Sequence, residues 1–332
     1  MVSPRAEAPY LPPELISWIL GTSSKPTLLS ASLVSRDWRG PSQDLLESRL
    51  SLPTSKAARA WLACPGRKTR TCRLSLGSGL SIDECWEVFD SCEALEELAL
   101  VPDPSRARAK FDLRALQSPK LKKLHTLHLA APFADLAPAV PWPLPFSLKT
   151  LTCKGLYHIY PKPIVAAIAA SSRTTLVELD LDCYGSNASA RAFMSAFRPA
   201  TECLQSMEIH GADRHTPLLP FIASCRVLSR FACWEATSAL LTALPATVTT
   251  LEIGKTIFHS DAPYEDMFAR ANLLAQLKRV RWGGISRATL RAQIGGNELL
   301  EECRERDIEV EFGVVRNGGL YGSYGWPICG AK

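Results

Sequence analysis

A short pattern of apolar and polar positions returns along most of the chain. It consists of an apolar residue, two other residues, an apolar residue, one other residue and a last apolar residue. Clear copies are LEELAL, LHTLHL, LKTLTC and LVELDL, which start at 95, 124, 148 and 176, and looser copies start at 204, 228, 248 and 277. Less complete copies start at 47, 71 and 307. Self-similarity at intervals of 20 to 30 residues predicts a solenoid built from stacked units.

The end of each copy predicts a short strand, because its last two apolar positions alternate with polar ones. The segments between the copies predict helices over residues 55–63, 83–91, 163–171, 188–197, 217–224, 238–244, 265–274 and 286–306. Strand, helix and parallel strand form a right-handed coil. We therefore predict an α/β solenoid with one parallel sheet on its concave face, and a non-solenoid α/β domain is the alternative. A proline-rich loop is expected over 131–145.

The N-terminal stretch 10–52 carries three short helical patterns of its own. Leu11, Leu15 and Ile19 are spaced to line one face of a first helix. Thr27 is expected to cap a second helix, and Gly40–Pro41 is expected to open a third, with proline in its first turn. Three helices in about forty residues bury only a small core, so part of their apolar surface is expected to be left for a partner.

The order of residues in this stretch resembles the F-box, the adaptor-binding module of Skp–cullin–F-box ubiquitin ligases. The resemblance is carried by Leu11-Pro12, Glu14-Leu15, Ile19-Leu20, Leu28-Leu29, Leu33-Val34 and Trp38. The chain has Ser35 where the family usually has cysteine, and Thr27 where the family usually has an acidic residue. The alternative is a helical N-terminal cap on a larger domain.

Together with the repeats, this resemblance is to F-box proteins with degenerate leucine-rich repeats, a class with fungal members. It implies a disordered N-terminus over 1–9, a three-helix F-box over 10–50, a solenoid over 51–312 and a glycine-rich tail over 313–332. It implies a substrate-recognition subunit that docks a Skp-type adaptor and, through it, cullin. The adaptor-binding residues that it implies are Leu11, Pro12, Leu15, Ile19, Leu20, Leu28, Leu29, Leu33 and Trp38. The alternative is a leucine-rich-repeat scaffold outside any ligase.

The polar positions of the strands are expected to face the concave surface, where an unidentified target protein would bind. Their charge is uneven along the chain, with an acidic middle and a basic far end beside a tryptophan. The predicted target-binding residues are Glu178, Asp180, Asp182, Glu208, Arg230, Trp234, Arg279 and Arg281. Clustered like charge repels itself, and a partner of opposite charge would relieve that cost. We hypothesise that the acidic middle engages a basic segment with Trp234 as anchor, whereas the alternative is that these faces are polar because they are wet.

Composition and motifs limit the functions that we expect for this chain. The sequence has no GxSxG, Walker, HExxH or strand–GxGxxG–helix pattern, so we expect no catalytic residues, no cofactor and no metal site. A net charge of +5 over 332 residues does not argue for binding of nucleic acid or membrane. Eleven cysteines without a CxxC pair, and no signal-like N-terminus, favour reduced thiols and a cytoplasmic or nuclear location.

Overall fold

The computed structural model describes most of the repeat region and part of the N-terminus. The described residues are 12, 15–16, 19–20, 23, 25–63, 71–106, 109–130, 133, 144–154, 162–182, 187–210, 218–234, 236–254, 268 and 273–313. The predicted N-terminus 1–9 lies outside the described residues, as do most of the loop 131–145 and of the helix 265–274. Of the predicted tail 313–332, only Gly313 is described, and it ends the last strand.

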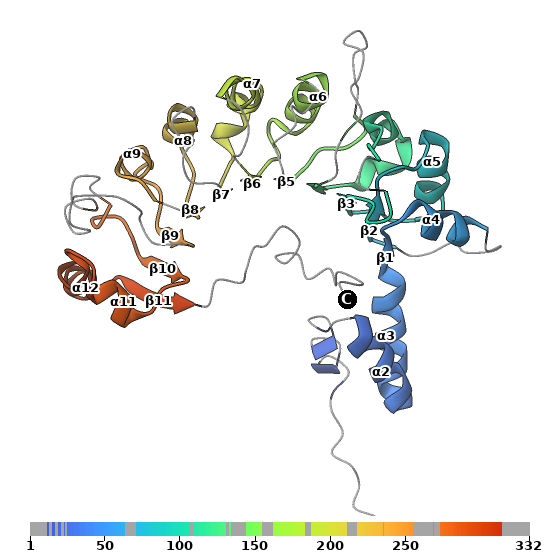
Figure 1. The fold of residues 1–332 in the computed structure, drawn as a ribbon, viewed down its shortest axis with the longest axis horizontal. Coiled ribbons are helices and arrows are strands. Elements are labelled where there is room, and N and C mark those ends of the chain that lie inside the picture. The colour runs from blue at the N-terminus through green and yellow to red at the C-terminus, as the bar shows by residue number, and fades with distance from the viewer. Residues whose placement is uncertain are drawn as a thin grey trace, which may run out of the picture.

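Eleven strands form one parallel sheet whose order follows the chain from β1 to β11. The strands are β1 (Arg49–Leu52), β2 (Arg73–Gly77), β3 (Glu97–Val101), β4 (Thr126–Leu129), β5 (Thr150–Cys153), β6 (Glu178–Asp182), β7 (Ser206–His210), β8 (Arg230–Cys233), β9 (Thr250–Ile253), β10 (Arg279–Gly283) and β11 (Glu309–Gly313). Each one ends a copy of the repeated pattern, so the predicted α/β solenoid is confirmed. The strands line the inner side of an arch (Figure 1).

Helices form the outer side of this arch (Figure 1). They are α4 (Ser55–Leu62), α5 (Ile82–Asp90), α6 (Lys162–Ser172), α7 (Asn187–Phe197), α8 (Leu219–Ser224), α9 (Ser238–Thr242), α11 (Arg287–Arg291) and α12 (Gly296–Glu305). The described residues also include three short 3₁₀ helices, η1 (Leu113–Gln117), η2 (Pro119–Lys123) and η3 (Arg198–Glu202). The unit between β3 and β4 therefore uses 3₁₀ turns where the unit between β2 and β3 uses the α-helix α5.

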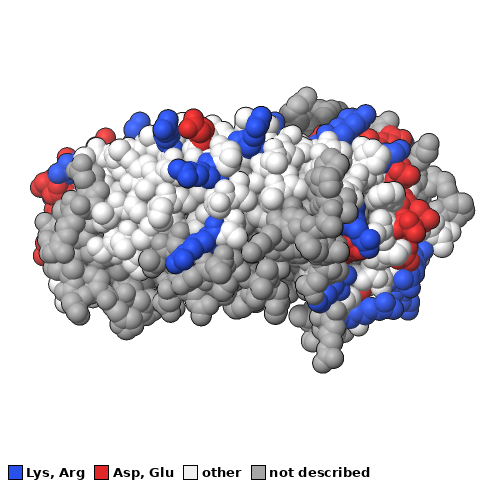
Figure 2. All heavy atoms as spheres, turned by 90° about the horizontal axis from the view of Figure 1, so that it is seen from above, with Lys and Arg blue, Asp and Glu red and all other residues white. Residues whose placement is uncertain are grey.

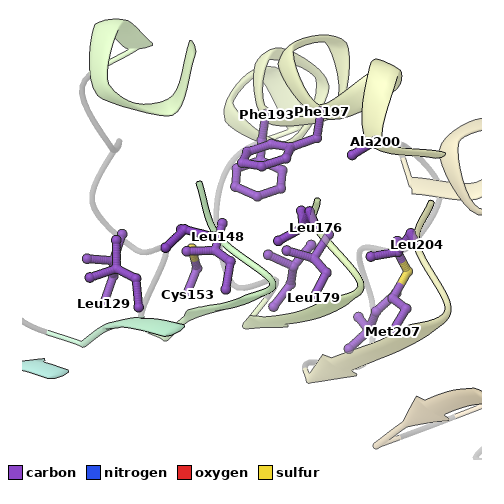
Figure 3. Packing of buried hydrophobic residues seen from close by; sticks show 14 of the residues in the cluster. Leu129, Leu148, Cys153, Leu176, Leu179, Phe193, Phe197, Ala200, Leu204 and Met207 are labelled. Atoms are coloured by element: carbon purple, nitrogen blue, oxygen red, sulfur yellow. The ribbon is translucent and has the colours of Figure 1, made fainter. Parts of the chain in front are cut away.

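The core lies between the sheet and the helices, because in-register pairing puts equivalent apolar side chains side by side. One row of them is Leu50, Leu74, Leu98, Leu127, Leu151, Leu179, Met207, Phe231, Leu251, Val280 and Val310. In Figure 3, Phe193 and Phe197 of α7 lie above Leu176 and Leu179, with their rings stacked at a centroid distance of 4.4 Å. Burying each such side chain stabilises the fold by about 1.5–3 kcal/mol.

A buried carboxylate ties the first three units together. Asp103, which follows β3, accepts hydrogen bonds from the backbone N–H of Ser55 (3.1 Å) at the start of α4 and of Ser105 (2.8 Å). Its own N–H donates to the hydroxyl of Ser78, 3.0 Å away, beyond β2. Burial alone would raise the pKa of Asp103, but the hydrogen bonds from Ser105 and Ser55 outweigh it and lower the pKa.

The N-terminal helices differ from the prediction in their boundaries. The structure gives α2 (Lys25–Val34) and α3 (Arg36–Ser48), so Thr27 lies inside α2 and Pro41 lies inside α3. The new helix begins after Ser35, whose hydroxyl accepts a hydrogen bond from the Trp38 N–H at 3.3 Å. The predicted break at Gly40–Pro41 is wrong because the cap at Ser35 starts the helix before the proline, and α3 continues through it.

The predicted three-helix F-box appears only in part. Leu15, Ile16, Ile19 and Leu20 are helical, but their neighbours in that first helical pattern lie outside the described residues. A small core separate from that of the solenoid consists of Ile16, Leu20, Leu28 and Ala31, with Trp38, Leu45 and Leu46 packed against it. The described residues therefore show a helical pair with an additional helical segment, not a complete three-helix module.

The helical pair is joined to the solenoid without a linker. Helix α3 ends at Ser48, and β1 begins at the next residue, Arg49. The Ser48 carbonyl also accepts a hydrogen bond from the Cys72 N–H at 3.1 Å, just before β2. The end of α3 is thus held by the first two units of the sheet, which fixes how the helical pair sits at that end of the arch (Figure 1).

The C-terminal segment 286–306 forms two helices where the sequence predicted one. Gly295 between α11 and α12 has a φ of 72°, in the left-handed region that glycine adopts at little cost. At Gly296, a Cβ would lie 2.0 Å from the carbonyl oxygen of Leu290. The prediction of a continuous helix is wrong because this close approach of α12 to α11 requires a sharp turn at the two glycines.

Candidate interaction surfaces

An apolar surface lies on the N-terminal helices. We define the apolar N-terminal face as Leu15, Ile19, Leu29, Leu33 and Val34. Leu33 and Val34 are the most open of them, at 80% and 75% exposed. Among the described residues there are eight exposed large hydrophobic side chains, and five of them belong to this face. The other three, Trp86, Val227 and Ile294, lie apart from it on the solenoid.

The predicted adaptor-binding residues divide into two groups. Pro12, Leu15, Ile19, Leu29 and Leu33 are exposed and available to a partner. Leu20, Leu28 and Trp38 instead form or cover the small core of the helical pair. Leu11 lies outside the described residues. Val34 was not in the predicted set, although its adjacency to Leu33 in an apolar pair is the signal that could have included it.

The concave face carries the predicted target-binding residues that the structure describes. Alternation along β6 buries Leu179 and Leu181 and turns Glu178 and Asp180 toward the inner side. The same parity places Glu208, Arg230, Trp234, Arg279 and Arg281 on this side. Asp182 is the last residue of β6, and its side chain is not among the described ones. The set shares one surface, and binding of a target by it stays a prediction.

Ion pairs between neighbouring strands neutralise most of the charge on this surface. The shortest N–O distances between strands are 3.1 Å for Arg73–Glu97, 2.7 Å for Lys154–Asp180, 2.9 Å for Arg230–Glu252 and 2.7 Å for Arg279–Glu309. Within β7, His210 lies 2.9 Å from Glu208. Besides His128 and His210, the described side chains at inner positions comprise six arginine or lysine residues and seven acidic ones. They are Arg49, Arg73, Lys154, Arg230, Arg279 and Arg281, and Glu97, Glu178, Asp180, Glu208, Glu252, Glu309 and Glu311.

The acidic middle of the concave face is not an uncompensated cluster. The sequence predicted that Glu178, Asp180 and Glu208 repel one another. In the structure, Asp180 and Glu208 have cationic partners on β5, β7 and β8. The outer surface shows scattered charge with acidic groups gathered toward its two ends (Figure 2). Recognition by the concave face is therefore expected to depend on local geometry rather than on a long-range field.

A polar cluster occupies the centre of the concave face. Lys154, Asp180, Glu208 and His210 come from three successive units, with Asp180 paired to Glu208 in the strand register. Burial alone would raise the pKa of Asp180, but His210 and Lys154 lower it to about 2. Burial would lower the pKa of His210, but the carboxylates of Asp180 and Glu208 raise it to about 9. The cluster thus favours a positive charge on the imidazole at neutral pH.

Trp234 lies beside this cluster over a glycine. It follows β8 and is half-buried, and Gly254 holds the equivalent place after β9. A Cβ at Gly254 would lie 2.9 Å from Cε3 of the Trp234 ring. Gly283 and Gly313 continue the same register position in β10 and β11. The indole therefore packs against the bare backbone of Gly254, whereas the Arg281 guanidinium covers the backbone of Gly313.

The cysteines of the described region are suited to packing rather than to nucleophilic chemistry. All eight are free thiols, and most of them are buried. Burial raises the pKa of Cys85 and of Cys225 to about 12, which suppresses the reactive thiolate. Among the described helices, none has both the length and the apolar character needed to cross a bilayer.

Comparison with known proteins adds little to this geometry. A scan against models of protein families finds no match. A comparison with curated proteins finds no match either. Among solved structures, the leucine-rich repeat-containing protein LegL7 from Legionella pneumophila is similar over 80% of this chain and 88% of its own, with 14% identity and a TM-score of 0.45. The solenoid fold rests on the eleven stacked parallel strands themselves.

Proposed function

We propose that the protein is a substrate-recognition subunit of a Skp–cullin–F-box ubiquitin ligase. The apolar N-terminal face would dock a Skp-type adaptor, and the concave face would hold a target protein. The observation that carries this proposal is the concentration of exposed apolar side chains on the segment whose sequence resembles an F-box. The chain itself makes no bond, and it contributes proximity and orientation.

The exposed face is costly to leave in water. Covering a leucine or valine side chain completely is worth about 1.5–3 kcal/mol. Leu29, Leu33 and Val34 project from one helix, and Leu15 and Ile19 come from the helical segment before it. A helical adaptor that covers all five would gain several such contributions, offset by the freedom lost on association. The small core of the helical pair is what holds these side chains in place.

The junction with the solenoid suits the proposed role. A ligase subunit must hold its target at a fixed position relative to the adaptor. Here α3 continues directly into β1, and Ser48 is hydrogen-bonded to the next unit through Cys72. The apolar N-terminal face and the concave face thus belong to one continuous framework, and a target bound on the arch would keep a defined orientation to the adaptor.

Co-purification tests this proposal. The full chain would be produced with a Skp-type adaptor and cullin, beside a variant that combines Leu29→Asp and Leu33→Asp and a control variant Ile294→Asp. All three substitutions fall on exposed side chains, so folding should be retained in each protein. We expect the wild type and the control to retain adaptor and cullin, and the double variant to lose both.

Other outcomes would point elsewhere. If the folded wild type retains adaptor but no cullin, the protein is a scaffold that acts outside the ligase. If the folded wild type retains neither, the N-terminal helices are a cap on a leucine-rich-repeat binding module, and the F-box proposal is wrong.

A further inference from the structure

Two carboxylates converge on a single imidazole nitrogen at the centre of the concave face. The Nε2 atom of His210 lies 2.9 Å from Oε1 of Glu208 and 3.2 Å from Oδ1 of Asp180. Glu208 and His210 come from one strand, and Asp180 comes from the strand beside it. All three donor atoms lie within 4.8 Å of one another. Three potential ligands therefore surround one point.

A proton on Nε2 places positive charge beside both carboxylates, but it cannot donate a hydrogen bond to both of them at once. A single N–H can point along only one direction, whereas the two carboxylate oxygens lie in different directions from Nε2. The atom is buried, yet it makes no hydrogen bond of acceptable geometry with any described group. Both carboxylates favour positive charge at this point, and either a proton or a divalent cation can supply it. A cation placed between the three donors would engage all of them together.

The distances suit a transition-metal ion. Zinc binds imidazole nitrogen and carboxylate oxygen at about 2.0–2.2 Å, so ligand atoms of a tetrahedral site lie about 3.3–3.6 Å apart. The two separations from Nε2, 3.2 and 2.9 Å, are slightly shorter than that value. One imidazole with two carboxylates is a donor set that Zn²⁺, Mn²⁺ and Co²⁺ accept.

We propose that Asp180, Glu208 and His210 form a binding site for a divalent transition-metal ion, with Zn²⁺ the best match. Three protein ligands leave a coordination position open, and the site lies on the inner surface that a target would contact. A nitrogen or oxygen ligand from a bound partner could complete it. This assignment stands on the geometry of the solenoid and does not require that the protein act in a ubiquitin ligase.

Lys154 gives the proposal a directional test. Its ammonium lies 2.7 Å from Oδ1 of Asp180, the oxygen that also contacts His210. A divalent cation at the site would be repelled by this charge and would compete with it for the carboxylate. The substitution Lys154→Met should therefore strengthen metal binding, although it removes an ion pair. Loss of a residue with a purely structural role would not have this effect.

The experiment uses the full chain, stripped of metal by a chelator and titrated with Zn²⁺ alone by calorimetry. We expect one ion per chain, a loss of affinity of roughly tenfold or more in Asp180→Asn and in His210→Gln, and a gain of several-fold in Lys154→Met. Glu178→Gln is the matched control, because it lies on the same face and contacts Thr150. Glu208→Gln supplies an independent ligand variant if His210→Gln does not fold.

Cysteines are the main competing source of metal binding, and Co²⁺ distinguishes them by the charge-transfer absorption of thiolate ligands. Thiolate absorption would overturn the proposal, as would no binding by the folded wild type. Equal affinities in the wild type and in the variants of Asp180, Glu208 and His210 would also overturn it, and so would weaker binding in Lys154→Met. Each of these outcomes is independent of adaptor capture.

Discussion

The two candidate surfaces differ in chemistry: one is apolar and exposed, and the other is charged and internally paired. The apolar N-terminal face leaves five large hydrophobic side chains uncovered, while the small core beneath it is closed. The concave face carries many ionisable side chains, and neighbouring strands pair most of them with an opposite charge. The first surface leaves apolar area open to water, whereas the charges of the second are largely paired within the protein. Association should therefore be strong and apolar at the first surface, and selective at the second.

The largest loss of stability is expected on removal of a buried charge, and a smaller one on removal of a charge that is paired at the surface. The substitution Asp103→Ala leaves the N–H groups of Ser55 and Ser105 without their acceptor. The free energy of unfolding should fall by about 3 kcal/mol, as measured by chemical denaturation. Glu301→Ala breaks an exposed ion pair with Arg304 and should change the free energy of unfolding by less than about 0.5 kcal/mol. Equal effects of the two substitutions would contradict this distinction.

The helical pair offers the sharpest internal contrast. Leu28 is 2% exposed, and Leu33 lies five residues further on in the same helix. Leu28→Ala should destabilise the helical pair by about 2–3 kcal/mol, because it opens a cavity in a small core. Leu33→Ala should change stability by less than about 0.5 kcal/mol and should weaken adaptor binding instead. Thermal unfolding and adaptor titration of both variants separate the two roles.

Protonation of Asp103 at low pH should reproduce part of the loss of stability expected for Asp103→Ala. Because the pKa of this carboxyl is lowered in the folded state, its contribution is present above the unfolded value of about 3.9 and is lost as pH falls through the folded pKa. The difference in unfolding free energy between the wild type and Asp103→Asn should therefore shrink below about pH 3.9. A difference that stays constant down to the acid transition would show that the charge of Asp103 is not what stabilises the turn.

The smallest effect is expected from the paired charges of the concave face. Arg279 is half-exposed, and its guanidinium reaches Glu309 at 2.7 Å across the last two strands. Arg279→Met should change the free energy of unfolding little, because exposed ion pairs gain little net energy. The measured change should also shrink at high salt. A large, salt-independent loss would mean that the ion pairs of this face hold the sheet together.

The strands were predictable from sequence because their alternation has a period of two, and each of the eleven copies shows it locally. The helix boundaries were harder to predict from the sequence. The cap at Ser35 and the turn at Gly295 outweighed the proline and the helical pattern that the sequence favoured. These choices depend on packing between neighbouring helices, which a local pattern does not contain.

The candidate surfaces show the same limit. Adjacent apolar residues in the N-terminal stretch look alike in sequence, yet Leu28 is buried and Leu29 is exposed. The acidic residues of β6 and β7 looked unpaired because Lys154 and Arg230 belong to other repeats, at least twenty residues away. The register of the parallel sheet brings these charges together. The same register places Asp180 beside Glu208 and His210.

Hydrogen exchange with and without the Skp-type adaptor tests the central proposal most directly. The account predicts that adaptor binding slows exchange across Lys25–Val34 and leaves Gly296–Glu305 at the far end of the solenoid unchanged. Leu33→Asp should abolish the protection. The account would be contradicted if the folded protein and adaptor gave no protection of Lys25–Val34, or if protection were confined to the strands of the concave face.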